Sequence, residues 1–313
     1  MIPRFLQPFT KPLKTGIKAL CFQWLRRSRL SGEQALRWAE RFKTWPGVFD
    51  SVYQNRVALH DPDFVMELGL IDVIERELTV KGVWDKPVLD ELKSRLQPGD
   101  VFIDIGANIG YFSLVASRLV GAGGRVYSFE PSPINVGRLA RHLTVNSVEN
   151  TSILSVGLGH EDEEVRLHFP TRNNAGASTI RAIEAGASMQ SHPIVVRRLD
   201  SIVPEWQRSP KLIKIDIEGA ELNALKGMEK LLREHRPTVL CEMTGEFLQD
   251  MDASIEEMLL FMENLGYGTT RLGDLHAGEA RQLIADDPKT WPNHQIDVVF
   301  EPVKTRGQVG ERR

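Results

Sequence analysis

Short apolar runs alternate with segments of helical periodicity in the middle of this chain. Residues 101–105 are apolar except for Asp104, and residues 109–119 then carry apolar side chains at helical spacing. A second apolar run, residues 125–129, ends at Glu130. Runs this short and this apolar are typical of parallel strands that helices cover on both faces. The pattern therefore predicts a strand–helix–strand unit of an α/β fold.

The same alternation continues towards the carboxyl end of the chain. It predicts further helices at 133–146, from near Gly219 to 232, and at 254–265. Further strands are expected at 153–156, 165–169, 194–199, 212–217 and 238–241, with a closing antiparallel hairpin at 267–272 and 295–301. Residues 165–169 are interpreted as the start of an extension of the main sheet. Together these elements predict a doubly wound, Rossmann-like sheet, mostly parallel with an antiparallel edge strand.

The first part of the chain has a different pattern. Residues 14–29 place apolar side chains at helical spacing between cations, and a second helix is expected from Ser31. Short β-rich pieces follow at 48–53, 56–59, 64–68 and 78–80, and then a helix at 84–96. We interpret residues 1–97 as a basic amphipathic helix with a helical and β cap, 98–302 as the main domain, and 303–313 as a disordered tail.

Residues 14–29 have two interpretations. The helix can rest on an anionic membrane surface, or it can dock on the protein's own domain with a solvated basic rim. The second is favoured because such helices are common. The only cysteines, Cys21 and Cys241, cannot form a disulfide framework, which is typical of a reducing compartment. We therefore expect a cytoplasmic protein, peripheral at the inner membrane face if 14–29 binds lipid.

Composition narrows the partners further. A chain of 313 residues can form one α/β domain with additions, and a net charge of −3 gives no reason to expect nucleic acid as a partner. No apolar run reaches the length of a signal-peptide core or a membrane-spanning helix. A small molecule, or an acceptor linked to a glycan or lipid, is the expected partner.

The glycine turn after the first predicted strand indicates the ligand. Gly106 and Gly110 bracket a turn where the backbone approaches something closely, but Asn108 stands where a dinucleotide site has its middle glycine. Glu130 follows Gly110 by twenty residues, where a carboxylate can accept hydrogen bonds from ribose hydroxyls. Asp104 and Asn108 suit a ligand that has an amino acid moiety and no phosphate, because they can bind its ammonium group. The turn thus favours S-adenosylmethionine over NAD(P).

A second constellation consists of carboxylates. The alternation of the strand predicted at 212–217 places Asp216 and Glu218 on the same side at its carboxyl end, and Glu242 follows the next strand. These three are the candidate bases, because an alcohol is barely ionised at neutral pH and crowding raises the pKa of at least one carboxylate. Glu221 is interpreted as a charge at a helix start. A divalent cation held by the cluster is kept as an alternative, but no metal ligand is assigned.

These motifs resemble the FkbM family of S-adenosylmethionine-dependent methyltransferases. The likeness rests on D-I-G-A-N-I-G-Y (104–111), F-E-P (129–131) with Asn135 beyond it, and K-I-D-I-E-G-A-E (214–221) followed by L-K-G (225–227). Asp216 and Glu218 are expected at the reaction centre, with Glu242 as the next candidate. The residues expected to bind the cofactor are Asp104, Gly106, Ala107, Asn108, Gly110, Glu130, Pro131, Ser132, Asn135, Gly157 and Leu158. Asn135 also reads as a polar group at a helix start.

The resemblance implies O-methylation of a hydroxyl on a sugar, glycolipid or natural-product acceptor. Two alternatives stay open, an NAD(P)-dependent oxidoreductase and a non-catalytic binding module that keeps the fold. Residues 171–192 are small and polar, which is typical of a lid or binding segment, with Arg172, Arg181 and His192 able to reach an acceptor. The family often carries a glutamate near the pocket before the first core strand. Here that segment is W-D-K-P (84–87), so no such contact is assigned.

Overall fold

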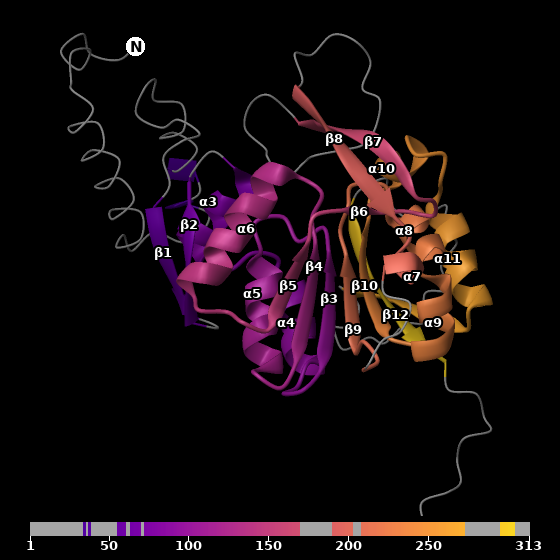
Figure 1. Ribbon diagram of the computed structural model, residues 1–313, viewed down its shortest axis with the longest axis horizontal. Coiled ribbons are helices and arrows are strands. Elements are labelled where there is room, and N and C mark those ends of the chain that lie inside the picture. Colours follow the sequence, from indigo (N-terminus) through magenta and orange to yellow (C-terminus); the bar gives the residue numbers. More distant parts are fainter. Residues whose placement is uncertain are drawn as a thin grey trace, which may run out of the picture.

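A seven-stranded sheet forms the centre of the computed structural model, which describes residues 34–35, 37–38, 55–60, 63–69, 72–169, 190–202, 208–272 and 295–303. The strand order is β11-β12-β10-β9-β3-β4-β5 (Figure 1). The strands from β10 to β5 are parallel, and β11 and β12 run antiparallel at one edge. The predicted fold class is confirmed. The strands are β3 (Val101–Ile105), β4 (Arg125–Phe129), β5 (Thr151–Leu154), β9 (Leu212–Ile215), β10 (Thr238–Met243), β11 (Tyr267–Arg271) and β12 (Ile296–Pro302).

Helices cover both faces of this sheet, because its strands are apolar on both sides. On one face, Phe102 of β3 packs in a cluster with α4 (Lys86–Arg95), α5 (Tyr111–Val120) and α6 (Pro133–Val145). On the other face, Ile103 and Ile105 pack with the second set of helices. That set consists of α7 (Leu199–Ile202), α8 (Glu221–Gly227), α9 (Glu229–His235), α10 (Gly245–Gln249) and α11 (Ile255–Asn264).

The cap before the sheet combines a hairpin and a helix. Strands β1 (Asn55–His60) and β2 (Asp63–Leu68) pair antiparallel, and α3 (Val73–Lys81) follows. The strand predicted at 78–80 is therefore wrong. Asp72 accepts a hydrogen bond from the backbone of Glu75, and Gly82 ends the helix in the left-handed conformation, so both helix ends are capped. A short apolar run does not distinguish a strand from a buried helical turn.

A second sheet corrects another prediction. Residues 165–169 do not extend the main sheet. They belong to a three-stranded sheet of order β6-β8-β7, made of β6 (Gly157–Leu158), β7 (Glu163–Phe169) and β8 (Gln190–Arg197). It stands above α7 and α8 in Figure 1. Alternating side chains predict a strand, but they do not say which neighbour it pairs with.

Several predictions fall outside the described residues. They are the amphipathic helix at 14–29, the β-rich piece at 48–53, most of the loop at 171–192, and the tail beyond Val303. Of the helix expected from Ser31, the four residues that are described are helical. Within the described ranges, no helix combines the length and hydropathy that a bilayer crossing requires.

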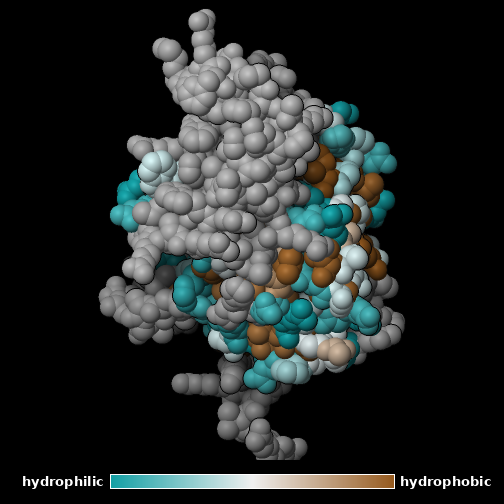
Figure 2. Space-filling view, turned by 90° about the vertical axis from the view of Figure 1, so that its left-hand side faces the viewer, coloured by the Kyte–Doolittle hydropathy of each residue, from teal (hydrophilic) through white to brown (hydrophobic). Residues whose placement is uncertain are grey.

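The described surface is mixed in character. On the side of the N-terminal hairpin, hydrophilic and hydrophobic residues lie next to one another (Figure 2). The exposed large hydrophobic residues among those described come from four separate segments, at Trp38, Ile134, Leu260 and Val303. No described element therefore presents more than one of them.

Candidate active site

A cavity of about 300 Å³ opens at the carboxyl ends of the parallel strands. Its volume is at the lower end of the range for small-molecule sites. Three regions far apart in the sequence form its walls: the turns after β3, β4 and β9, the small sheet, and the cap. The lining includes Val73, Ile74, Trp84, Gly106, Asn108, Glu130, Pro131, Asn135, Gly157, Leu158, Ile194, Val196, Asp216, Ile217, Glu218, Glu242 and Gln295.

The glycine turn after β3 brings two walls of the cavity together. Gly106 has a φ of 79°, and a Cβ there would lie 1.9 Å from the carbonyl oxygen of Asp216. Only glycine therefore lets the turn after β9 approach this closely. Asn108 has a φ of 49°, a conformation that asparagine tolerates better than most residues. The predicted close approach at Gly106 is thus to the protein's own backbone.

Glu130 lies at the carboxyl end of β4 and is 5% exposed. Its Oε2 accepts a hydrogen bond from Asn108 N at 2.8 Å, and its Oε1 accepts one from Ser132 N at 2.9 Å. Asn135 Nδ2 donates to Oε1 at 3.4 Å. Burial raises the pKa of Glu130 to about 7, although these hydrogen bonds oppose the shift. The carboxylate is thus fixed in orientation at the cavity wall.

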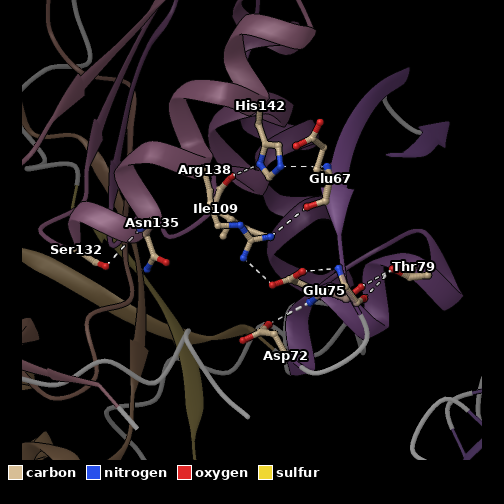
Figure 3. A network of polar contacts seen from close by, with 10 residues as sticks. Glu67, Asp72, Glu75, Thr79, Ile109, Ser132, Asn135, Arg138 and His142 are labelled. Atoms are coloured by element: carbon tan, nitrogen blue, oxygen red, sulfur yellow. Dashed lines mark hydrogen bonds and ion pairs between the residues drawn. The ribbon is translucent and has the colours of Figure 1, made fainter. Parts of the chain in front are cut away.

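Four of the predicted cofactor residues do not line the cavity: Asp104, Ala107, Gly110 and Ser132. Asp104 is 1% exposed, and its Oδ2 accepts a hydrogen bond from Ser113 Oγ at 2.6 Å. Ser132 caps α6 through the backbone N–H of Asn135 (Figure 3). A Cβ on Gly110 would meet a methyl group of Leu139 at 2.2 Å, so this glycine serves packing. The cofactor contacts of these four residues stay predictions.

The carboxylates after β9 are brought together by a turn. The strand ends at Ile215, two residues earlier than predicted, so the alternation of a strand does not place Asp216 and Glu218. A positive φ of 56° at Glu218 redirects the chain, and Glu221 Oε1 accepts hydrogen bonds from the backbones of Ile217 and Gly219, at 3.2 and 3.0 Å. Asp216 and Glu218 nevertheless line the cavity together with Glu242. Glu221 has the structural role expected for it, although it holds the turn as well as the helix start.

Lys214, Asp85 and Asp297 were missed by the sequence analysis. Lys214 is 4% exposed and places its Nζ 3.0 Å from Asp216 Oδ2. Burial lowers the pKa of Lys214, but the carboxylates of Asp216 and Asp104 outweigh it and hold the pKa above its ordinary value. Asp85 and Asp297 line a smaller cavity beside Lys214. A lysine inside an apolar strand, and an aspartate in I-D-V-V-F (296–300), were the available signals.

Asp297 and Glu242 both have a raised pKa. Burial, and then the charges of Asp85 and Asp216, raise the pKa of Asp297 to about 7. Burial, and then Asp216 and Asp297, raise the pKa of Glu242 well above its usual range. Among the residues that the structure describes, no three acidic, histidine or cysteine side chains are placed to hold a metal ion.

A network of polar contacts joins β2 and α3 of the cap to α6 (Figure 3). Arg138 Nη1 of α6 lies 2.6 Å from Glu75 Oε1 of α3, and its Nη2 donates to Glu67 O at 3.1 Å. His142 Nε2 accepts a hydrogen bond from Glu67 N, and its Nδ1 donates to Ile109 O at 2.7 Å. Burial lowers the pKa of His142, which favours the neutral ring that both bonds require. The network holds α3 where its first turn lines the cavity.

Comparison with known proteins identifies the family. Residues 104–268, more than half of the chain, match the model of the methyltransferase FkbM domain. The chain belongs to the FkbM methyltransferase family. This membership confirms the expected enzyme class, an S-adenosylmethionine-dependent methyltransferase, and the oxidoreductase alternative is set aside. The matched range begins at Asp104 and contains every carboxylate that was predicted to be catalytic.

The chain is similar to three methyltransferases from different organisms. Methyltransferase 1 of Beauveria bassiana is 31% identical over 63% of this chain and 80% of its own. The 31-O-demethyl-FK506 methyltransferase FkbM of Streptomyces tacrolimicus is 28% identical over 61% of this chain and 82% of its own. The hexuronic acid methyltransferase AglP of Haloferax volcanii is 27% identical over 59% of this chain and 76% of its own.

Proposed function

We propose that this chain transfers the methyl group of S-adenosylmethionine to a hydroxyl of a sugar, glycolipid or natural-product acceptor, with a carboxylate as the base. One observation carries the proposal. A single cavity joins Glu130 at the end of β4 to Asp216, Glu218 and Glu242 after β9 and in β10. Glu130 is suited to bind the ribose of a nucleoside. The other three carboxyls are suited to contact the acceptor hydroxyl.

The residues at the Glu130 end fit the cofactor. The fixed carboxylate of Glu130 can accept hydrogen bonds from both ribose hydroxyls. Leu158, Ile194 and Val196 add apolar walls of the kind that an adenine ring requires. Gly157 packs closely against this wall, because a Cβ there would lie 3.2 Å from a methyl group of Val196. The cofactor, when bound, supplies a methyl group on a sulfonium with a good leaving group.

The acceptor end combines an aromatic side chain with carboxylates. Trp84 and the α3 residues Val73 and Ile74 form an apolar wall, and Asp216 and Glu218 lie on the same cavity. A ring that carries hydroxyls can stack on such a wall while its hydroxyls donate to carboxylates. Two relatives have names that specify oxygen or sugar-acid acceptors, the O-demethyl-FK506 and the hexuronic acid methyltransferases. A hydroxyl acceptor is therefore favoured over an amine.

Calorimetric titration with S-adenosylmethionine tests the cofactor half of the proposal. The native protein is expected to bind it, and Glu130→Ala to lose at least about tenfold in affinity, since the ribose loses its charged acceptor. Asp216→Asn is expected to retain affinity within about threefold, because its role concerns the acceptor. Glu256→Ala, an exposed acid on α11, is the matched control. Binding of NAD in place of S-adenosylmethionine would refute the assignment.

A panel of hydroxyl acceptors tests the second half. Release of S-adenosylhomocysteine is expected with a sugar or polyol acceptor and is expected to be lost in Asp216→Asn. Binding of the cofactor without release across sugars, glycolipids and polyketide alcohols would favour the non-catalytic module instead.

A further inference from the structure

Ionisable residues form a row across one face of the sheet. Side chains alternate along a strand, so Asp104, Lys214, Glu242 and Asp297 share the face of Phe102, Leu212, Leu240 and Val299, which all pack in the cluster of α4 and α5. The register joins them. Asp104 lies opposite Lys214 on β3 and β9, and Glu242 lies opposite Asp297 on β10 and β12.

The row carries far more acid than base. Asp85, which caps α4, and Asp216 lie on the same small cavity as Lys214, Glu242 and Asp297. With Asp104 the group has five carboxyls for the single Lys214 ammonium. This cavity has a volume of about 10 Å³, close to the space that one water occupies. Like charges directly opposite on paired strands repel, and crowded carboxyls therefore retain protons.

The cation of the row is not shared equally among the carboxyls. Lys214 Nζ forms its ion pair with Asp216 Oδ2 at 3.0 Å and also lies 5.2 Å from the ring centre of Phe112. In the part of the chain that the structure describes, no cation pairs with Glu242 or Asp297. Burial and the charges of Asp216, Asp297 and Glu218 raise the pKa of Glu242, and the charge of Lys214 lowers it by less than burial and these acids raise it. Glu242 is also the member of the β10–β12 pair that lines the large cavity.

We propose that the row separates two roles in methyl transfer: Asp216, paired with Lys214, takes the acceptor proton, and Glu242, which lies opposite Asp297, donates a hydrogen bond into the cavity. Lys214 and Asp297 are then positioning residues, which act through Asp216 and Glu242. The inference rests on the proposed function for its chemistry. The high pKa of Glu242 and the pKa of about 7 at Asp297 agree with it.

The step balances with no further reactant. The acceptor oxygen forms a bond to the methyl carbon while the carbon–sulfur bond breaks and its electron pair stays on sulfur. The hydroxyl proton passes to Asp216, which returns it to solvent after release. Glu242 keeps its own proton throughout and orients the acceptor.

The test is a pH titration of the native protein with carboxyl-¹³C-labelled glutamate, followed by infrared or carbon NMR spectroscopy. One glutamate is expected to remain protonated at about pH 8.5, above the ordinary range of glutamate, and its signal to vanish in Glu242→Gln. Asp297→Asn is expected to lower its midpoint by about one pH unit or more, because a negative neighbour is removed. Glu256→Gln is the control. The native titration alone decides the point if a variant fails to fold.

Two outcomes overturn the inference. The first is a native protein in which every glutamate is ionised at about pH 8.5. The second is an Asp297→Asn midpoint equal to the native one, which removes the role of Asp297. Calorimetry with S-adenosylmethionine on the same samples separates the two proposals. If the protein binds the cofactor but no glutamate keeps its proton, only the roles proposed for the row are refuted. If a glutamate keeps its proton but the cofactor does not bind, only the proposed function is refuted.

Turnover then distinguishes donor from base, once the acceptor panel has found a substrate. Glutamine donates a hydrogen bond as protonated glutamate does, so Glu242→Gln is expected to keep at least about tenfold more turnover than Asp216→Asn. The reverse order would make Glu242 the base and overturn the assignment.

Discussion

At the scale of single residues, the site depends on backbone positions that few side chains can occupy. Gly106 and Gly82 have nearly the same φ, 79° and 77°, but their surroundings differ. At Gly82 a Cβ would meet nothing within 4 Å, whereas at Gly106 it would collide with the backbone of Asp216. The pair therefore separates the cost of the conformation from the cost of the close approach.

We expect Gly82→Ala to lower the free energy of unfolding by about 1–2 kcal/mol, the cost of a left-handed Cβ. Gly106→Ala is expected to cost at least about 1 kcal/mol more, because the turns after β3 and β9 must move apart. Urea unfolding of both variants measures the difference. Equal losses would mean that the contact between Gly106 and Asp216 does not constrain the fold.

At the scale of elements, the sequence predicted most of the sheet and less of the site. The unit from β3 to β4 was predicted almost to the residue, because glycines and polar residues bound each element. The strand predicted at 212–217 is too long at its carboxyl end. Asp216 and Ile217 continue the sequence pattern of the strand, but the chain turns there, and Glu221 Oε1 accepts hydrogen bonds from the backbones of Ile217 and Gly219. Motifs located Glu130 and Asp216. Asp297 was missed because only the strand order brings β12 beside β10.

The ion pair between α3 and α6 gives a prediction at this scale. Arg138 and Glu75 are 17% and 8% exposed, and a double-mutant cycle with Arg138→Met and Glu75→Gln is expected to give a coupling of about 1–3 kcal/mol. Either single variant should also raise the KM for the acceptor, because α3 carries part of the apolar wall at the acceptor end of the cavity. The more exposed pair Lys81–Glu77, on the same helix, is expected to give about 0.3–0.5 kcal/mol. Equal couplings in the two cycles would contradict this prediction.

At the scale of the whole molecule, burial raises the pKa of several carboxyls in the ligand-free protein. Glu130, Glu221 and Asp297 each have a pKa raised by burial to about 7. A pKa that is higher in the folded state than in the unfolded chain means that folding favours the protonated form. The stability that this contributes is fully present below the unfolded pKa, near 4, and is lost as the pH rises through about 7.

We therefore expect the melting temperature of the ligand-free protein to fall by roughly 5 °C or more between about pH 5.5 and pH 8. Ordinary surface carboxyls are ionised across this window and contribute little to the change. Calorimetric melts in matched buffers measure it, and Glu130→Gln is expected to flatten the curve. A melting temperature that rises across the window would contradict the burial of these acids.

The position of β12 also affects how the chain is made. It is the last described strand, but it lies inside the sheet between β10 and β11. The chain must therefore be synthesised through Pro302 before the sheet is complete. Until then, one edge of β10 is unpaired. An open edge of this kind invites pairing with another chain, so the interval before β12 emerges is the period when a nascent chain most needs protection from aggregation.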